Sequence, residues 1–161
     1  FMTTRFGGAL MTGLSMGPRL IQRQSLELTL TEKLEMKIAV TVITPRAICP
    51  ECGYQMDEDE VRAGWLEDAQ DFTTECPDCD HRFVAALDTR NRETGHEASF
   101  RYLCRHQLFW AMRALQQRRK RSLLGQVFLE TESPELFWNM IRHFGTYEIG
   151  RKHYKTWCTG N

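Results

Sequence analysis

Cys49-Pro-Glu-Cys52 is followed, after 23 intervening residues, by a second pair of the same form, Cys76-Pro-Asp-Cys79. Two such pairs can bring four thiolates to one tetrahedral ion, at a spacing slightly wider than that of the usual four-cysteine zinc pattern. Four sulfur ligands leave no open position for water, so the predicted site is structural. We expect zinc as the cofactor, with iron as the alternative, held by Cys49, Cys52, Cys76 and Cys79.

Residues 45–90 are predicted to form one small unit around these cysteines. A short helix is expected to begin at Asp57, because acidic residues fill its first turn, where the helix dipole favours them. Strands predicted over residues 72–75 and 82–87 flank the second cysteine pair and indicate a hairpin. A hairpin of this size buries little apolar surface, so metal binding is expected to supply part of its folding free energy.

Residues 49–87 resemble a zinc ribbon, the cysteine-knuckle hairpin common in transcription and translation proteins. The resemblance implies a structural metal and a module that binds DNA, RNA or protein. Cys52-Gly-Tyr54 and Cys76-Pro-Asp-Cys79 also resemble the knuckles of rubredoxins, whose iron carries electrons. The segment between the pairs is shorter than in rubredoxins and lacks their Pro-Gly loop, which favours zinc.

The chain on either side is predicted to be mainly helical, giving an α+β fold in which a small zinc-ribbon hairpin precedes a helical C-terminal part. The predicted divisions are 1–44, a flexible N-terminus with an amphipathic segment, 45–90, the zinc ribbon, and 99–161, the helical basic region. Residues 88–98 are polar and predicted to be a linker. Apolar residues alternate with period two between residues 26 and 42, yet the residue types favour a helix over 31–39.

Start and stop residues define the C-terminal helices. Ser99 is the expected N-cap of a helix over 99–121, whose apolar side includes Trp110. Ser133-Pro134 is a helix start signal and Gly145 a stop signal, so a helix is predicted up to Phe144. A further helix is expected over residues 147–156.

The net charge of zero conceals a division along the chain. Residues 49–98 contain 4 basic and 14 acidic side chains, whereas residues 99–161 contain 11 basic and 4 acidic ones. The acidity of the ribbon argues against its contacting phosphates, because nucleic-acid binding requires a cationic surface. We therefore expect the C-terminal region to contact nucleic acid. The alternative is that the two oppositely charged segments attract each other.

The segment from Phe137 to Tyr154 resembles a helix-turn-helix, with a His143-Phe-Gly-Thr146 turn similar to that of homing-endonuclease-associated repeats. This resemblance implies that the following helix contacts DNA; a helical hairpin that serves only packing is the alternative. The run Arg118-Arg-Lys-Arg121 adds further cations. The expected nucleic-acid contacts are Arg118, Arg119, Lys120, Arg121, Arg151, Lys152 and Lys155.

The N-terminal segment Gln22–Met36 resembles the activator-contacting region of the nitrogen-type alternative sigma factor. That region is helical, and the resemblance implies a protein partner.

Several classes of function are disfavoured by the sequence. It has no apolar run long enough to span a membrane and no recognisable leader segment, so a cytoplasmic protein is expected. No catalytic constellation or phosphate loop is present, which predicts a protein that is not an enzyme and has no small-molecule substrate. We expect a zinc-binding factor associated with nucleic acid or the transcription machinery. The alternative is a structural or assembly component that joins larger protein partners.

Overall fold

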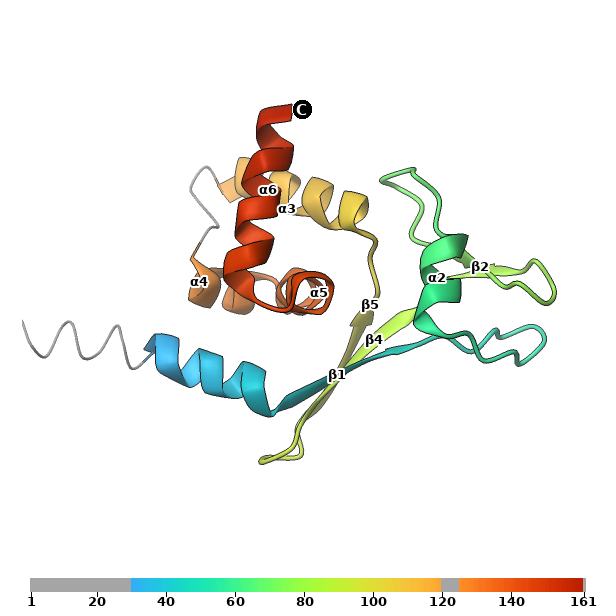
Figure 1. Ribbon diagram of the computed structural model, residues 1–161, viewed down its shortest axis with the longest axis horizontal. Helices are drawn as coiled ribbons and strands as arrows, with labels where there is room; N and C mark the ends of the chain where they lie inside the picture. The colour runs from blue at the N-terminus through green and yellow to red at the C-terminus, as the bar shows by residue number, and fades with distance from the viewer. Residues whose placement is uncertain (1–29, 120–124, 161) are drawn as a thin grey trace, which may run out of the picture. The chain divides into compact units, whose positions relative to one another are not determined.

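The computed structural model describes residues 30–119 and 125–160 (Figure 1). The chain divides into two compact units after Ala39. Residues 30–40 are helical, which confirms the helix predicted over 31–39 against the strand alternative. The flexible N-terminus and the sigma-like stretch before residue 30 lie outside the described residues. The cysteine pairs and the C-terminal helices all belong to the second unit.

The second unit contains a three-stranded antiparallel sheet. Its strands are β1 (Thr41–Arg46), β4 (Ala86–Asn91) and β5 (Glu97–Arg101), in the order β1-β4-β5. β1 is an edge strand, so it tolerates Pro45, which has no amide hydrogen to donate. The sheet therefore joins strands from both sides of the cysteine pairs.

The predicted linker over residues 88–98 is wrong, because β4, a turn and β5 occupy this segment. Leu87 and Thr89 are buried, while their neighbours are partly or fully exposed. A sheet with one solvated face alternates in this way, and its polar residues made the strand look like a linker. Gly95 in the turn has φ +76°, a conformation that L side chains rarely adopt.

The cysteine pairs lie between β1 and β4 in sequence. Helix α2 (Glu58–Gly64) and the short strand β2 (Thr74–Glu75) lie between the two pairs, and the short strand β3 (Arg82–Phe83) follows the second pair. β2 and β3 pair antiparallel, as predicted for the hairpin around the second pair. The predicted strand over 82–87 is in fact two strands, because the chain leaves β2 after Phe83 and pairs with β1 from Ala86.

Four helices complete the second unit: α3 (Arg105–Arg119), α4 (Gln126–Glu132), α5 (Pro134–Phe144) and α6 (Tyr147–Gly160). Helix α5 packs against each of the other three. Ser133 caps α5 by accepting a hydrogen bond from the amide of Leu136, and Gly145 ends the helix at φ +80°, both as predicted. The mixed content of sheets and helices confirms the α+β class.

Ser99 does not cap α3, which begins six residues later than predicted. Ser99 lies in β5, and its hydroxyl donates to Asp88 Oδ1 at 2.7 Å. Cys104 and Gln107 instead start the helix, because Gln107 N donates to Cys104 Sγ and Cys104 N donates to Gln107 Oε1. Phe100 lies opposite Leu87 in the sheet, so an apolar residue expected on the helix belongs to a strand.

The C-terminal helices enclose an apolar core. Leu108, Leu129, Phe137 and Met140 are each fully buried. Gly150 allows α6 to approach α5 closely, since a Cβ atom there would lie 2.2 Å from Met140 Sδ. No helix among the described residues is both long and apolar enough to cross a bilayer.

Candidate metal centre

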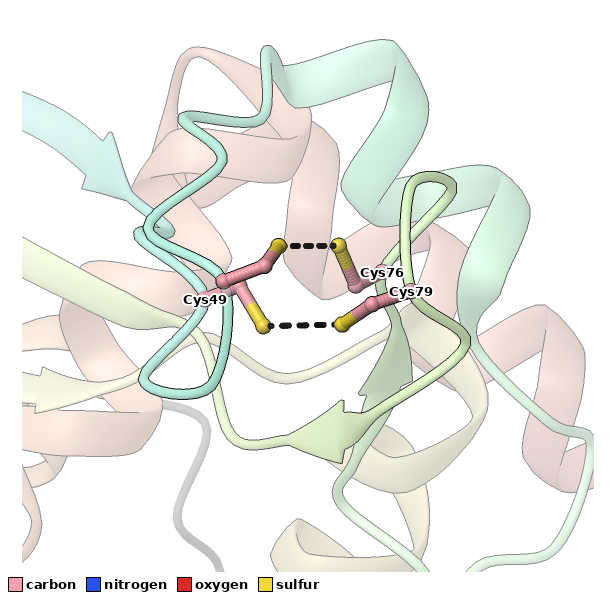
Figure 2. Close-up of side chains that lie close together, drawn as sticks. Cys49, Cys76 and Cys79 are labelled. Carbon is pink, nitrogen blue, oxygen red and sulfur yellow. Dashed lines mark hydrogen bonds between the residues drawn. The ribbon is translucent and has the colours of Figure 1, made fainter.

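The two cysteine pairs face each other across a small space (Figure 2). The Sγ atoms of Cys49 and Cys79 lie 3.6 Å apart, as do those of Cys52 and Cys76. All four Sγ atoms lie within 4.8 Å of one another. Zinc–sulfur bonds of about 2.3 Å in a tetrahedron place sulfur atoms roughly 3.8 Å apart. The predicted cysteine cluster can therefore hold one metal ion, with zinc and iron both compatible with four sulfur ligands.

The two pairs form equivalent turns. Gly53 N donates to Cys49 O at 2.8 Å, and Asp80 N donates to Cys76 O at 2.9 Å. Both turn residues have positive φ, +78° for Gly53 and +63° for Asp80. Asp adopts this left-handed conformation less readily than Gly, as expected from its place after Cys79. This repeated turn positions both sulfurs of each pair toward the same space.

Backbone amides and neighbouring thiols set the charge of the cluster. Burial acts to raise the pKa of Cys49, but the amides of Cys52 and Glu51 and the adjacent thiols lower it to about 7. The amide of Tyr54 favours the thiolate of Cys52, yet burial and the other cysteines raise the Cys52 pKa to about 12. Thiolates this close resist ionising together, and a bound dication supplies the opposite charge. Metal binding is therefore expected to release protons.

The second pair is anchored to helix α2. Thr74 is buried, and its hydroxyl donates to Val61 O at 2.8 Å. Gly64 lies so close to β2 that a Cβ atom would meet Thr74 Oγ1 at 2.3 Å and Glu75 N at 2.7 Å. Arg82 donates to the carbonyls of Gly64 and Thr73, at 3.1 and 2.8 Å. These contacts hold the β2–β3 hairpin in place independently of the sulfurs.

Helix α2 is also joined to the C-terminal helices through Glu58. Arg142 on α5 donates to both carboxylate oxygens of Glu58, at 2.6 and 3.0 Å, and to Ile43 O on β1 at 3.0 Å. The Tyr102 hydroxyl donates to the same carboxylate. The bonds from Arg142 outweigh partial burial and lower the pKa of Glu58 to about 2. An acidic residue of the 49–98 segment and a basic residue of the 99–161 segment thus form an ion pair within the folded protein.

His143, predicted as the first residue of a helix-turn-helix turn, belongs to this junction. Its Nε2 lies 2.5 Å from Leu103 O, and burial lowers its pKa to about 4. The imidazole stacks on Tyr102 at 5.4 Å, and the edge of Trp65 meets Tyr102 at 4.9 Å. The side chain of His143 therefore packs against the segment that connects β5 to α3.

The predicted nucleic-acid contacts differ in their surroundings. Arg119 forms an ion pair with Glu132, and Arg151 forms one with Glu148 at 2.6 Å. Three of the cations are exposed and form no ion pair among the described residues: Arg118, Lys152 and Lys155. Beside the hydrogen bond from Arg151, the charges of Lys152 and Lys155 nevertheless act on Glu148 and help to lower its pKa. Lys120 and Arg121 lie outside the described residues.

Trp110 was expected on the apolar side of its helix, but 39% of its surface is exposed. Its apolar character and its spacing from Leu103 suggested burial, yet Leu103 precedes α3 and so does not share its helical period. The sequence does indicate that α3 has a basic exposed face, because its 15 residues include four arginines and no acidic residue.

Comparison with known protein families, curated proteins and solved structures finds no match. The resemblances to zinc ribbons, rubredoxins, helix-turn-helix repeats and the sigma factor therefore rest on short sequence motifs alone. Among these likenesses, the first receives support from the geometry of the cysteine cluster.

Proposed function

We propose that this protein is a non-enzymatic zinc-binding factor that associates with nucleic acid through its C-terminal helices. The cysteine cluster supplies four sulfur ligands to the ion and so leaves no position for a substrate or an activated water. The ion is given a structural role, because its four ligands come from two turns that are separated by 23 residues in the sequence. Nucleic-acid binding is then assigned to the basic helices downstream of the ribbon.

The observation that carries this proposal is the unbalanced charge of α3 and α6. Helix α3 has four arginines and no acidic residue, while Lys152 and Lys155 lie exposed on α6. Cations that form no ion pair can exchange their counterions for phosphates at low energetic cost. Arg142, by contrast, is already engaged by Glu58 and is not part of the proposed surface.

Elemental analysis of the purified protein tests the metal. One zinc per chain in a colourless protein is expected. One iron per chain, with the visible absorption of an iron–thiolate centre, would instead favour the electron-carrier alternative.

Binding of fluorescent oligonucleotides, followed by anisotropy at low and moderate salt, tests the partner. The double variant Lys152→Gln/Lys155→Gln is expected to weaken binding. It should also make the slope of log affinity against log salt concentration shallower, by up to about 0.9 for each phosphate that is no longer neutralised. Lys33→Gln/Arg90→Gln removes the same charge from exposed positions outside α3 and α6 and is expected to bind normally. Absence of binding by the native protein at low salt would overturn the proposal.

A second function, that of an assembly component, is favoured by the surface near the cysteine cluster. Ile48, Tyr54 and Val84 are exposed, and acidic residues flank both turns. Such a mixed apolar and acidic surface is suited to a protein partner. Co-purification of protein subunits that persists after nuclease treatment, together with indifference to nucleic acid, would favour this function.

A further inference from the structure

A chain of aromatic rings runs across α3, the end of α5 and α6. Trp110 meets Trp157 edge to face at 5.2 Å, and Trp157 lies 5.6 Å from Phe109. Phe109 stacks on Phe144 at 5.8 Å, and Phe144 stacks on His153 at 4.9 Å. The first and last rings of this series, those of Trp110 and His153, are exposed.

Cations border the aromatic chain. The guanidinium of Arg113 lies 5.4 Å from the ring centre of Trp110, and that of Arg105 lies 4.9 Å from the ring centre of Phe144. His106 adds a ring beside Trp110 at 6.3 Å. We call this surface the aromatic–cationic patch; it comprises Arg105, His106, Trp110, Arg113, His153 and Trp157.

Helix packing alone does not account for the patch. The packing of α3 on α6 is supplied by inner residues, since Phe109 and Tyr154 are buried against each other and the Tyr154 hydroxyl donates to Gln116. Trp110 adds an edge-to-face contact with Trp157 and leaves more than a third of its surface in solvent. An exposed tryptophan beside arginines, on a helix without acidic residues, matches a partner that offers both flat rings and negative charge.

We propose that the aromatic–cationic patch binds single-stranded nucleic acid, an inference that rests on the proposed function and identifies the form of nucleic acid. An unpaired base stacks on Trp110, and neighbouring phosphates contact Arg113 and Arg105. Single strands combine these two chemistries, because their bases can leave the stack and lie on aromatic rings while the backbone follows a basic surface. In a duplex the base faces are covered, so the exposed ring of Trp110 has no comparable partner.

Oligothymidylate and a duplex of equal length are the probes, titrated against the zinc-loaded full chain. Trp110→Ala is expected to weaken single-strand binding about tenfold, the effect of losing one stacked base. Trp110→Phe retains a ring and is expected to restore most of the affinity, while Arg113→Gln removes the adjacent charge. Ile149→Ala, an exposed apolar truncation on α6 outside the patch, is the matched control. Thermal unfolding of each variant verifies that it is folded.

The outcomes separate this inference from the proposed function. Loss of the single-strand preference in Trp110→Ala, with duplex binding unchanged, supports the inference. If Lys152→Gln/Lys155→Gln weakens binding while Trp110→Ala and Arg113→Gln do not, the inference is overturned and the proposed function stands. If neither probe binds at low salt, both fail. Displacement of the oligonucleotide by polyglutamate at equal charge would indicate an acidic protein partner and would also overturn the inference.

Discussion

The cysteine turns and the C-terminal helices are stabilised by different means. The turn at Cys76 is flanked by two-residue strands, and the turn at Cys49 is closed by a single bridge between Ile48 and Gln55, so the order of both turns depends on sulfur ligands and local hydrogen bonds. The helices bury complete side chains, including Phe137 and Met140. Metal loss and core truncation should therefore damage separate parts of the molecule, which are joined through the ion pair of Glu58 and Arg142.

The largest effect is expected from a change in the cysteine cluster. Cys76→Ser should abolish stoichiometric metal binding, because three sulfurs and a hydroxyl do not reproduce the site, and structural zinc contributes about 10 to 16 kcal/mol in isolated fingers. Metal analysis and amide exchange across residues 47–83 measure the result. Cys104→Ser, outside the cluster, should retain the metal. Simultaneous unfolding of α5 would show that the two regions are not separable.

The next largest effect is expected from the helical core. Phe137→Ala should lower the free energy of unfolding by about 3 to 5 kcal/mol, because it leaves a cavity where a fully buried ring lies. Denaturant unfolding measures the loss, and metal analysis should still find one ion per chain. The exposed substitution Ile149→Ala should change stability little. Loss of the metal in folded Phe137→Ala would contradict the comparison.

The junction between the regions should respond to pH. The pKa of Glu58 is held near 2 in the folded protein and lies near 4.5 when the group is free, so its stabilising effect is complete above about pH 4.5 and declines toward pH 2. After allowance for solvent screening, Glu58→Gln should cost about 1 to 2 kcal/mol at neutral pH.

The difference in unfolding free energy between native protein and Glu58→Gln should shrink as pH falls through this range. Comparing the two proteins at each pH removes the acid-induced loss of metal that both share. A difference that is constant from pH 6 to pH 2.5 would show that the ion pair does not join the regions.

The smallest effect concerns the residue with positive φ in each turn, which is Gly53 in the first and Asp80 in the second. Asp80→Gly should stabilise the metal-loaded protein by about 0.5 to 1 kcal/mol, because glycine adopts the positive φ of this residue without steric strain. Thermal unfolding with zinc in excess measures the gain. Gly53→Ala places a side chain at the equivalent position and should have the opposite effect. A loss of stability in Asp80→Gly would indicate a role for the carboxylate.

Features that depend on a few neighbouring residues were predicted from the sequence. The cysteine cluster, the hairpin, the start of α5 at Ser133 and its end at Gly145 were all expected. The capping box of α2, formed by Asp57 and Glu60, is equally local and could have been read from the sequence. The sequence places the last three residues of β5, 99–101, at the start of a helix and the first two in a linker, because the apolar residues fit both periods and the pairing partner is set by the sheet.

Short segments of sequence specify where four sulfurs can meet and where turns and helices begin, because sulfur ligation, capping and positive φ involve only a few neighbouring residues. The pairing of β1, β4 and β5 in one sheet, and the contact of Glu58 with Arg142, 84 residues away, arise only in the folded protein. The same is true of the exposure of Trp110 beside Trp157. These features depend on surfaces that meet only after the chain has folded, and residue type alone does not specify such partners.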